Sequence, residues 1–213
     1  MYHINKKEKE YLHVITRVLF VGGMQMETGE ALKIRSEKIK HITATGMMAA
    51  LITIMTAYIC HIPVGTNGGY IHFGDSLIYL AAVLLPRPYA FIAAAIGGGM
   101  ADLLTAPMWA PATIIIKMLI VLPFTNKSKK IINIWNVVAT VIAFFISGIG
   151  YFLAEYLIFG TWTALLDSVQ GTISALLVSM WGSLVQSGGS AIFFILFGIA
   201  LDKSQVKQKL FRL

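Results

Sequence analysis

The chain has 213 residues, of which 57% are hydrophobic and only 13% are charged, about half the charged share of a typical soluble domain. This composition excludes a water-soluble fold and indicates a membrane protein. Seventeen Lys and Arg against ten Asp and Glu leave a net charge of +7. In so apolar a chain we expect these cations to mark one side of a membrane rather than a nucleic-acid partner. The single cysteine, Cys60, excludes an internal disulfide framework and a multi-cysteine metal site.

The first 40 residues are predicted to form a basic cytoplasmic extension. Their apolar run from Val14 to Met24 is interrupted by Arg17 and is too short to cross a bilayer, so it is typical of an interfacial helix or a soluble extension. The alternative is that the natural protein starts at Met24 or Met26.

Six apolar runs follow, and each is a candidate for a helix that crosses a hydrocarbon core of about 30 Å. They cover residues 42–60, 71–85, 89–104, 111–124, 137–159 and 172–201. The three short runs in the middle are separated by Pro86-Arg87-Pro88 and by a segment that contains Pro107, and proline ends helices. The predicted fold is an all-α, polytopic membrane protein.

Basic residues gather on alternate connections between these runs. Residues 1–40 hold eight, the second connection one, the fourth three and the tail four, which is sixteen of the seventeen. Lys and Arg beside a span are retained in the cytoplasm, so the pattern predicts six transmembrane helices with both termini cytoplasmic. We therefore divide the chain into the extension 1–40, a membrane domain 41–201 and a basic cytoplasmic tail 202–213.

Four ionisable residues lie within the predicted spans, where each costs roughly 2.5–3.5 kcal/mol on insertion scales. They are Asp75, Asp102, Lys117 and Glu155, and the predicted topology places all four in the outer half of the bundle. This convergence favours an outward-opening polar pocket. In a second interpretation Lys117 pairs with Asp102 or Glu155 to neutralise charge, and Asp75 caps a helix. The two interpretations can coexist.

Polar and aromatic neighbours support the pocket. They are Asn67, Tyr70 and His72 near the first outer connection, Trp109 on the third, and Trp181 and Gln186 on the last span. Ring faces with a few polar groups suit a flat heteroaromatic ligand, whereas Tyr70 and Trp109 also suit an interfacial aromatic belt. His72 and Asp75 have a metal-ligand spacing, but two ligands are too few. We expect no metal and no cofactor.

Small residues form two further patterns. The first span has a four-residue repeat of Thr45, Ala49, Thr53 and Ala57, flanked by Gly46 and Ala50. Such a face lets another helix approach closely, and we interpret it as an interface with a partner protein, with packing inside the bundle as the alternative. The third span has a similar repeat of Ala90, Ala94, Gly98 and Asp102, which we interpret as internal packing.

Motifs of catalysis are missing from the sequence. It has no Gly-x-x-x-x-Gly-Lys-Ser/Thr phosphate loop for ATP hydrolysis and no His-Glu-x-x-His pair of a metalloprotease. We therefore expect a protein that is not an enzyme.

Three segments carry a resemblance to a known family: GGYIHFGD at 68–75, LLPRPYA at 84–90 and AAIGGGMADLL at 94–104. Together they resemble the substrate-binding S components of energy-coupling factor (ECF) transporters over about residues 41–201. The resemblance is closest to the branch associated with riboflavin, hydroxymethylpyrimidine and pyridoxine-type substrates. The turn Pro86-Arg87-Pro88 departs from the Gly-Pro turn that is usual in the family.

The resemblance implies a multi-pass protein of a prokaryotic plasma membrane. Such a protein captures a vitamin from outside and delivers it through a module of one transmembrane coupling protein and two ATPases. The small-residue face of the first span would contact the coupling protein. Substrate would be held by Tyr70, His72 and Asp75 on the first outer loop and by Lys117, Glu155, Trp181 and Gln186 on the last three spans. The alternative function is a stand-alone proton-coupled solute transporter with Asp102 and Glu155 as its proton relay.

Overall fold

A computed structural model of the chain describes residues 7, 10, 11, 13, 14, 29–59, 61–63, 70–159 and 169–211. The chain divides into two compact units, residues 1–40 and 41–213. In the first unit, the Lys40 ammonium lies 2.8 Å from the Glu37 carboxylate one helical turn away. Most of the apolar run from Val14 to Met24 lies outside the described residues.

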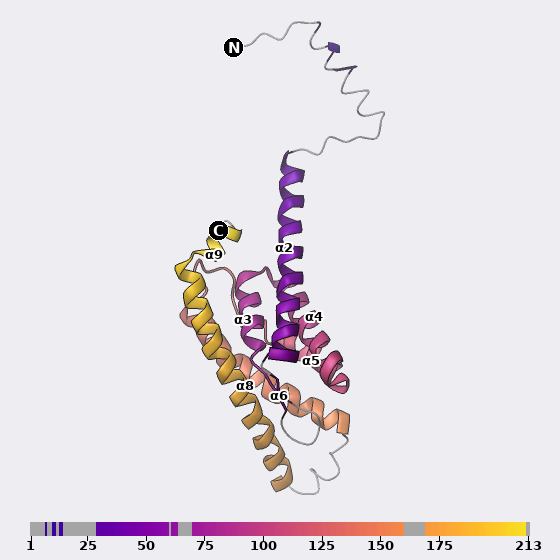
Figure 1. Cartoon of the computed structure of the whole chain (residues 1–213), viewed down its shortest axis with the longest axis vertical. Helices are drawn as coiled ribbons and strands as arrows, with labels where there is room; N and C mark the ends of the chain where they lie inside the picture. The colour runs from indigo at the N-terminus through magenta and orange to yellow at the C-terminus, as the bar shows by residue number, and fades with distance from the viewer. Residues whose placement is uncertain are drawn as a thin grey trace. The chain divides into compact units, whose positions relative to one another are not determined.

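The described chain is almost entirely helical (Figure 1). In chain order its elements are α2 (Gly29–Ile54), the π-helical turn η1 (Met55–Ile59), β1 (Ile62–Pro63), β2 (Tyr70–Ile71), α3 (Asp75–Leu84), α4 (Arg87–Thr105), the 3-10 turn η2 (Pro107–Trp109), α5 (Ala110–Leu119), α6 (Ile134–Phe159), α8 (Val169–Lys203) and α9 (Val206–Phe211). The strands pair antiparallel, with Ile62 opposite Ile71. This two-residue ladder is a small departure from the predicted all-α fold.

Four helical stretches of the described chain are long and apolar enough to cross a membrane. They are Leu32–Ile59, Arg87–Thr105, Ile134–Ile158 and Trp181–Lys203. Two further apolar helices, Asp75–Leu84 and Pro107–Leu119, are shorter. Each predicted span therefore coincides with an apolar helix, whereas the six-span topology and the cytoplasmic termini remain predictions.

Proline sets the boundaries of the short helices, as predicted. Leu85 has an extended backbone (φ −95°, ψ 152°) and ends α3, because the residue before a proline disfavours the helical region. Pro88 then stands in the first turn of α4, where its missing N–H costs nothing. Ala106 ends α4 in the same way before Pro107.

Helix α3 is the centre of the second unit. It packs against α4 and α8, and all its residues from Ile78 to Val83 are buried. The ring of Tyr79 stacks on Phe124 at a centroid distance of 4.8 Å, and Phe194 of α8 meets Tyr79 edge-on at 5.9 Å. An apolar helix buried on every side needs neighbours around it, which explains why so short a helix is stable here.

Three consecutive glycines let α4 pack closely on both sides. A Cβ atom at Gly97 would lie 2.7 Å from Cβ of Ile52 on α2, and one at Gly98 would lie 2.8 Å from Cγ of Lys117 on α5. A Cβ atom at Gly99 would lie 2.6 Å from Cγ1 of Ile114. This confirms the interpretation of the small residues of the third span as internal packing.

The four-residue repeat of the first span also packs inside the unit. Thr45, Ala49 and Ala57 are buried, and the Thr53 hydroxyl donates to the Gly97 carbonyl at 3.1 Å. These contacts fit the packing inside the bundle that the sequence left open as the alternative, and a partner interface on the first span stays a prediction.

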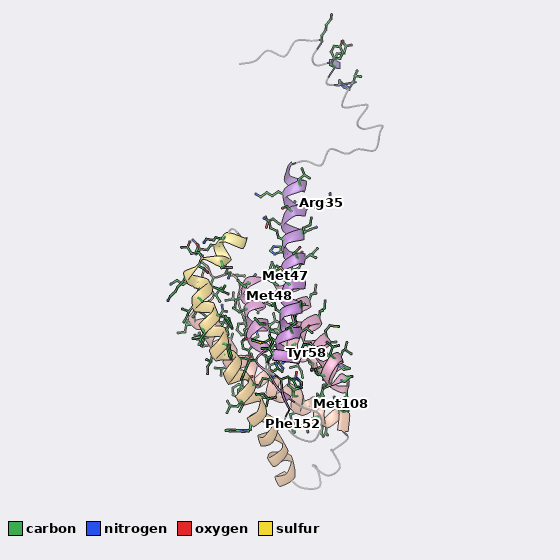
Figure 2. All side chains as sticks on the ribbon, in the orientation of Figure 1. Arg35, Met47, Met48, Tyr58, Met108 and Phe152 are labelled. Atoms are coloured by element: carbon green, nitrogen blue, oxygen red, sulfur yellow. The ribbon has the colours of Figure 1, made fainter. Side chains whose placement is uncertain are left out.

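The neighbours of that repeat lie on the outer side of α2. Gly46 and Ala50 are exposed, and a Cβ atom at Gly46 would meet nothing within 4 Å. Met47 and Tyr58, labelled in Figure 2, are 62% and 67% exposed. An outer face of α2 and η1 is therefore open as far as the described residues go.

We predict that Gly97→Ala destabilises the protein, because the added methyl group overlaps Ile52 and overpacking costs about 1–3 kcal/mol. Gly46→Ala is the matched control, since its methyl group enters open space. The thermal unfolding midpoint in detergent should fall by several degrees for Gly97→Ala alone. Equal midpoints for the two variants would contradict the close packing of α2 on α4.

Candidate functional site

Asp75 is the centre of a buried polar cluster drawn from three helices. It is the first residue of α3 and is completely buried. Lys117 of α5 places its ammonium 2.6 Å from one carboxylate oxygen, and the Gln186 side-chain amide of α8 donates to the other at 3.0 Å. Both carboxylate oxygens of Asp75 thus have a charged or polar partner, as a buried charge requires.

Lys117 is held from two further sides. Its aliphatic stem lies against Gly98, where any larger residue would displace it. Its ammonium also lies 5.3 Å from the centroid of the Tyr151 ring on α6, within the range of a cation–π interaction. The chain therefore fixes the position of the ammonium as well as its charge.

A second carboxylate, Asp102 of α4, lies in a neighbouring network. The Thr113 hydroxyl of α5 donates to Asp102 and lies 3.1 Å from the Tyr151 hydroxyl. A hydroxyl group has one hydrogen, so Tyr151 donates to Thr113 when Thr113 donates to Asp102. Trp109 packs edge-on against the same Tyr151 ring at 6.2 Å. Tyr151 thereby connects the environments of the two carboxylates.

His72 lies three residues before the first residue of α3 and is buried. Its Nδ1 atom accepts a hydrogen bond from the Gly74 backbone N–H at 3.1 Å, which assigns the ring hydrogen of a neutral imidazole to Nε2. The Thr56 hydroxyl of η1 occupies the space where a Cβ atom at Gly74 would stand. Glycine at position 74 therefore allows η1 to approach the start of α3 closely.

Three buried hydroxyl groups near these networks have no hydrogen-bond partner within the described part of the chain. They belong to Thr56, Ser147 and Ser190. Thr56 contacts Gly74, the neighbour of Asp75, while Ser190 and Ser147 stand one helical turn from Gln186 and Tyr151. Most buried hydroxyl groups in proteins are paired, so these three are exceptions within the described part of the chain.

Comparison with known proteins shows the family of this chain. The family profile described as "ECF-type riboflavin transporter, S component" matches residues 36–203, which is most of the chain. This chain belongs to the ECF S-component family. A Pyrococcus woesei protein, described as an uncharacterized protein in the gap 3′ region, is 28% identical over 122 residues, which is 57% of this chain and 82% of that relative.

Membership establishes the general role of the S component. The family consists of substrate-binding subunits of vitamin transporters and not of enzymes. Family membership and the apolar helices together show that this chain is a membrane protein that takes part in transport. Among the described residues there is no group of three or more His, Cys, Asp or Glu arranged to hold a metal ion.

The cluster and the network beside it contain four polar residues that the sequence singled out, Asp75, Asp102, Lys117 and Gln186, in a different pairing. The sequence-based interpretation paired Lys117 with Asp102 or Glu155. In the structure, Lys117 forms its ion pair with Asp75 instead. Asp75 makes no side-chain cap for α3, because its two oxygens face Lys117 and Gln186. Its position at the helix start satisfied the sequence pattern of a cap, but the buried ammonium is the stronger partner.

The remaining predicted residues lie apart or outside the description. Trp181 is 68% exposed, as is expected of a side chain on the outer surface of α8, and it is not part of the cluster. Glu155 is half-buried on α6. Asn67 lies outside the described residues, and of Tyr70 the backbone position in β2 is described.

Sequence reasoning missed two members of the neighbouring network, Thr113 and Tyr151. Thr113 precedes Lys117 by four residues, so it lies on the same face of α5, and this spacing was a usable signal. Tyr151 had no such signal, because it is one aromatic residue in a long apolar helix and its role depends on where α5 packs.

We predict that Lys117→Met lowers the stability of the protein by about 3–5 kcal/mol, because it leaves the Asp75 carboxylate buried without its cation. Adding Asp75→Asn removes the uncompensated charge and should restore much of the loss. Unfolding of the two single variants and the double variant in detergent measures the coupling. Losses that simply add would show that the two groups do not interact.

Proposed function

We propose that this S component binds a vitamin or a related small heteroaromatic compound from outside and passes it to an ECF module. The observation that carries the proposal is the cluster of Asp75, Lys117 and Gln186, which brings one cation, one anion and one amide together in the interior of an apolar chain. Buried ionisable groups are costly in a membrane, so a chain that needed only to fold would not require three helices to meet at them.

The surroundings of the cluster suit a flat polar ligand. Trp109 and Tyr151 supply aromatic surface, and the unpartnered hydroxyl groups of Thr56, Ser147 and Ser190 supply hydrogen bonds. We propose that Asp75, Asp102, Trp109, Lys117 and Gln186 line the substrate site and that Asn67, Tyr70 and His72 close it from the first outer loop. Glu155, half-buried on α6, and Trp181, exposed on α8, are the less favoured members of the set proposed from the sequence.

The ion pair narrows the recognition chemistry of this site. Asp75 already neutralises Lys117, so the pair offers a ligand a donor and an acceptor side by side instead of a net charge. An amide or imide edge of a heteroaromatic ring presents the complementary acceptor and donor. We therefore favour a substrate that is uncharged where it meets the pair.

Delivery is proposed to follow the family's route. The partners would be a transmembrane coupling protein and two ATPases, in a multi-pass arrangement of six spans with both termini in the cytoplasm of a prokaryotic cell. Family membership favours this route over a stand-alone proton-coupled transporter. The open face of α2 around Gly46 and Ala50, rather than the buried repeat beside it, is our proposed contact with the coupling protein.

Binding tests the proposal directly. We expect calorimetry of the purified protein against a panel of vitamins, riboflavin included, to find one ligand with a sub-micromolar Kd. Gln186→Leu should weaken that binding roughly tenfold, because it removes one hydrogen bond to the ligand, worth about 1.4 kcal/mol. The matched control, Gln208→Leu, changes an exposed glutamine of α9 and should bind as the wild type does. If no vitamin binds the wild type, the proposed function is wrong.

Coupling is tested on the outer face of α2. Gly46→Trp should leave ligand binding intact but abolish both co-purification with the coupling protein and vitamin uptake, because the bulky ring blocks a close helix approach. Gly188→Trp is the matched control, since it also adds an indole at an exposed glycine with nothing within 4 Å. Normal assembly of Gly46→Trp with the module would contradict the proposed contact.

A further inference from the structure

The C-terminal tail is attached to the connection between α5 and α6 by two side chains. Asp202, near the end of α8, accepts hydrogen bonds from the backbone N–H groups of Ile131 and Ile132 at 2.7 and 3.0 Å. Lys207 of α9 donates to the carbonyl oxygens of Asn126 and Ser128 at 2.8 and 2.6 Å and is only 2% exposed. Four hydrogen bonds to charged groups therefore fix the tail on this connection.

The connection itself is held from the other side. Asn136 in the first turn of α6 accepts from the Thr125 backbone N–H at 2.9 Å and donates to the carbonyl oxygens of Thr125 and Ile131 at 3.1 and 3.0 Å. The Asn126 side chain donates to the Leu85 carbonyl oxygen at the end of α3 at 3.0 Å. The segment from Thr125 to Ile132 thus has a fixed backbone although it contains no helix.

This attachment brings five lysines to one end of α6 and α8. All five are exposed and lie on the two attached segments: Lys127, Lys129, Lys130, Lys203 and Lys209. We call them the lysine surface. Asp202 is the single acidic residue of segments 120–154 and 170–213, and its carboxylate is engaged by backbone N–H groups. The lysine surface therefore has no nearby carboxylate in these segments to neutralise it.

Two residues beside the lysine surface indicate what it faces. Trp135 is 54% exposed, and its indole N–H donates to the Pro123 carbonyl oxygen at 2.8 Å. Ile134, the residue before it, is 86% exposed. A half-exposed tryptophan with its polar edge engaged is typical of the membrane–water interface. Beyond it, α6 and α8 continue with exposed apolar side chains such as Phe145 and Leu196, as expected of surfaces in contact with lipid tails.

We propose that the lysine surface binds anionic phospholipid headgroups of the adjoining leaflet. Each lysine near an anionic membrane surface raises the affinity of the protein for that surface roughly fivefold. A rigid surface also loses less entropy on binding than a flexible tail does. A protein partner is the less favoured occupant, because Trp135 and the apolar faces next to the lysines suit lipid. Lys207 takes no part in the binding, since its ammonium is engaged by carbonyl oxygens.

Native mass spectrometry of the purified full chain tests the proposal. Mixed micelles would contain equal amounts of phosphatidylglycerol and phosphatidylcholine with the same acyl chains. We expect the wild type to retain phosphatidylglycerol at least tenfold more than phosphatidylcholine, with a preference that weakens as salt rises. The variant K127Q/K129Q/K130Q should lose most of the preference, whereas K127R/K129R/K130R, which keeps the charge, should retain it.

Two results would overturn the proposal. One is an unchanged lipid preference in the Gln variant whose thermal unfolding midpoint matches the wild type. The other is a Gln variant that keeps its lipid preference but no longer co-purifies with a coupling protein, which would make the lysine surface a protein contact. A Gln variant with a lowered midpoint is replaced by K203Q/K209Q, which removes two lysines from the other segment and carries the same expectation.

Discussion

The ion pair between Asp75 and Lys117 is the constraint around which the second unit is arranged. A carboxylate and an ammonium that are both fully buried must stay together, so the start of α3 and the last turn of α5 have to meet. Gly98 provides the space for the lysine stem, and Gln186 brings α8 to the same point. The contacts of the polar cluster therefore also determine which helix ends pack together.

This arrangement also explains how an S component can keep charge within an apolar chain. Lys117 and Asp75 cancel each other, and Asp102 is engaged by the hydroxyl of Thr113. In the proposed site, a ligand would meet a set of oriented donors and acceptors, with Tyr151 shared between the two networks. Recognition by hydrogen-bond pattern rejects analogues that lack the matching group, because they leave buried polar atoms unpaired.

Much of the fold could be predicted from the sequence because membrane constraints act locally. Each of the six apolar runs coincides with a helix, and Pro86 and Pro107 set boundaries that the structure confirms. The ionisable residues Asp75, Asp102 and Lys117 were recognised as site candidates because each is costly within a span. Their pairing was not predictable, since a charge pattern along the chain does not say which helices are neighbours.

The small-residue repeat of the first span likewise did not tell which helix it packs against. Ala49 and Thr53 correctly indicated a close helix approach, and the helix that approaches them is α4 of the same chain. Gly97 on α4 was the matching half of that contact, and it lies some forty residues away. Likewise, Asp202 and Lys207 looked like ordinary tail charges until the structure placed them on the connection between α5 and α6.

The central claim is that the Asp75, Lys117 and Gln186 cluster receives the substrate. The most direct measurement is an experimental structure of the purified S component with the vitamin that it binds most tightly. The account predicts ligand nitrogen or oxygen atoms within hydrogen-bonding distance of at least two of these three side chains. A ligand bound elsewhere, with the ion pair closed and out of its reach, would contradict the account.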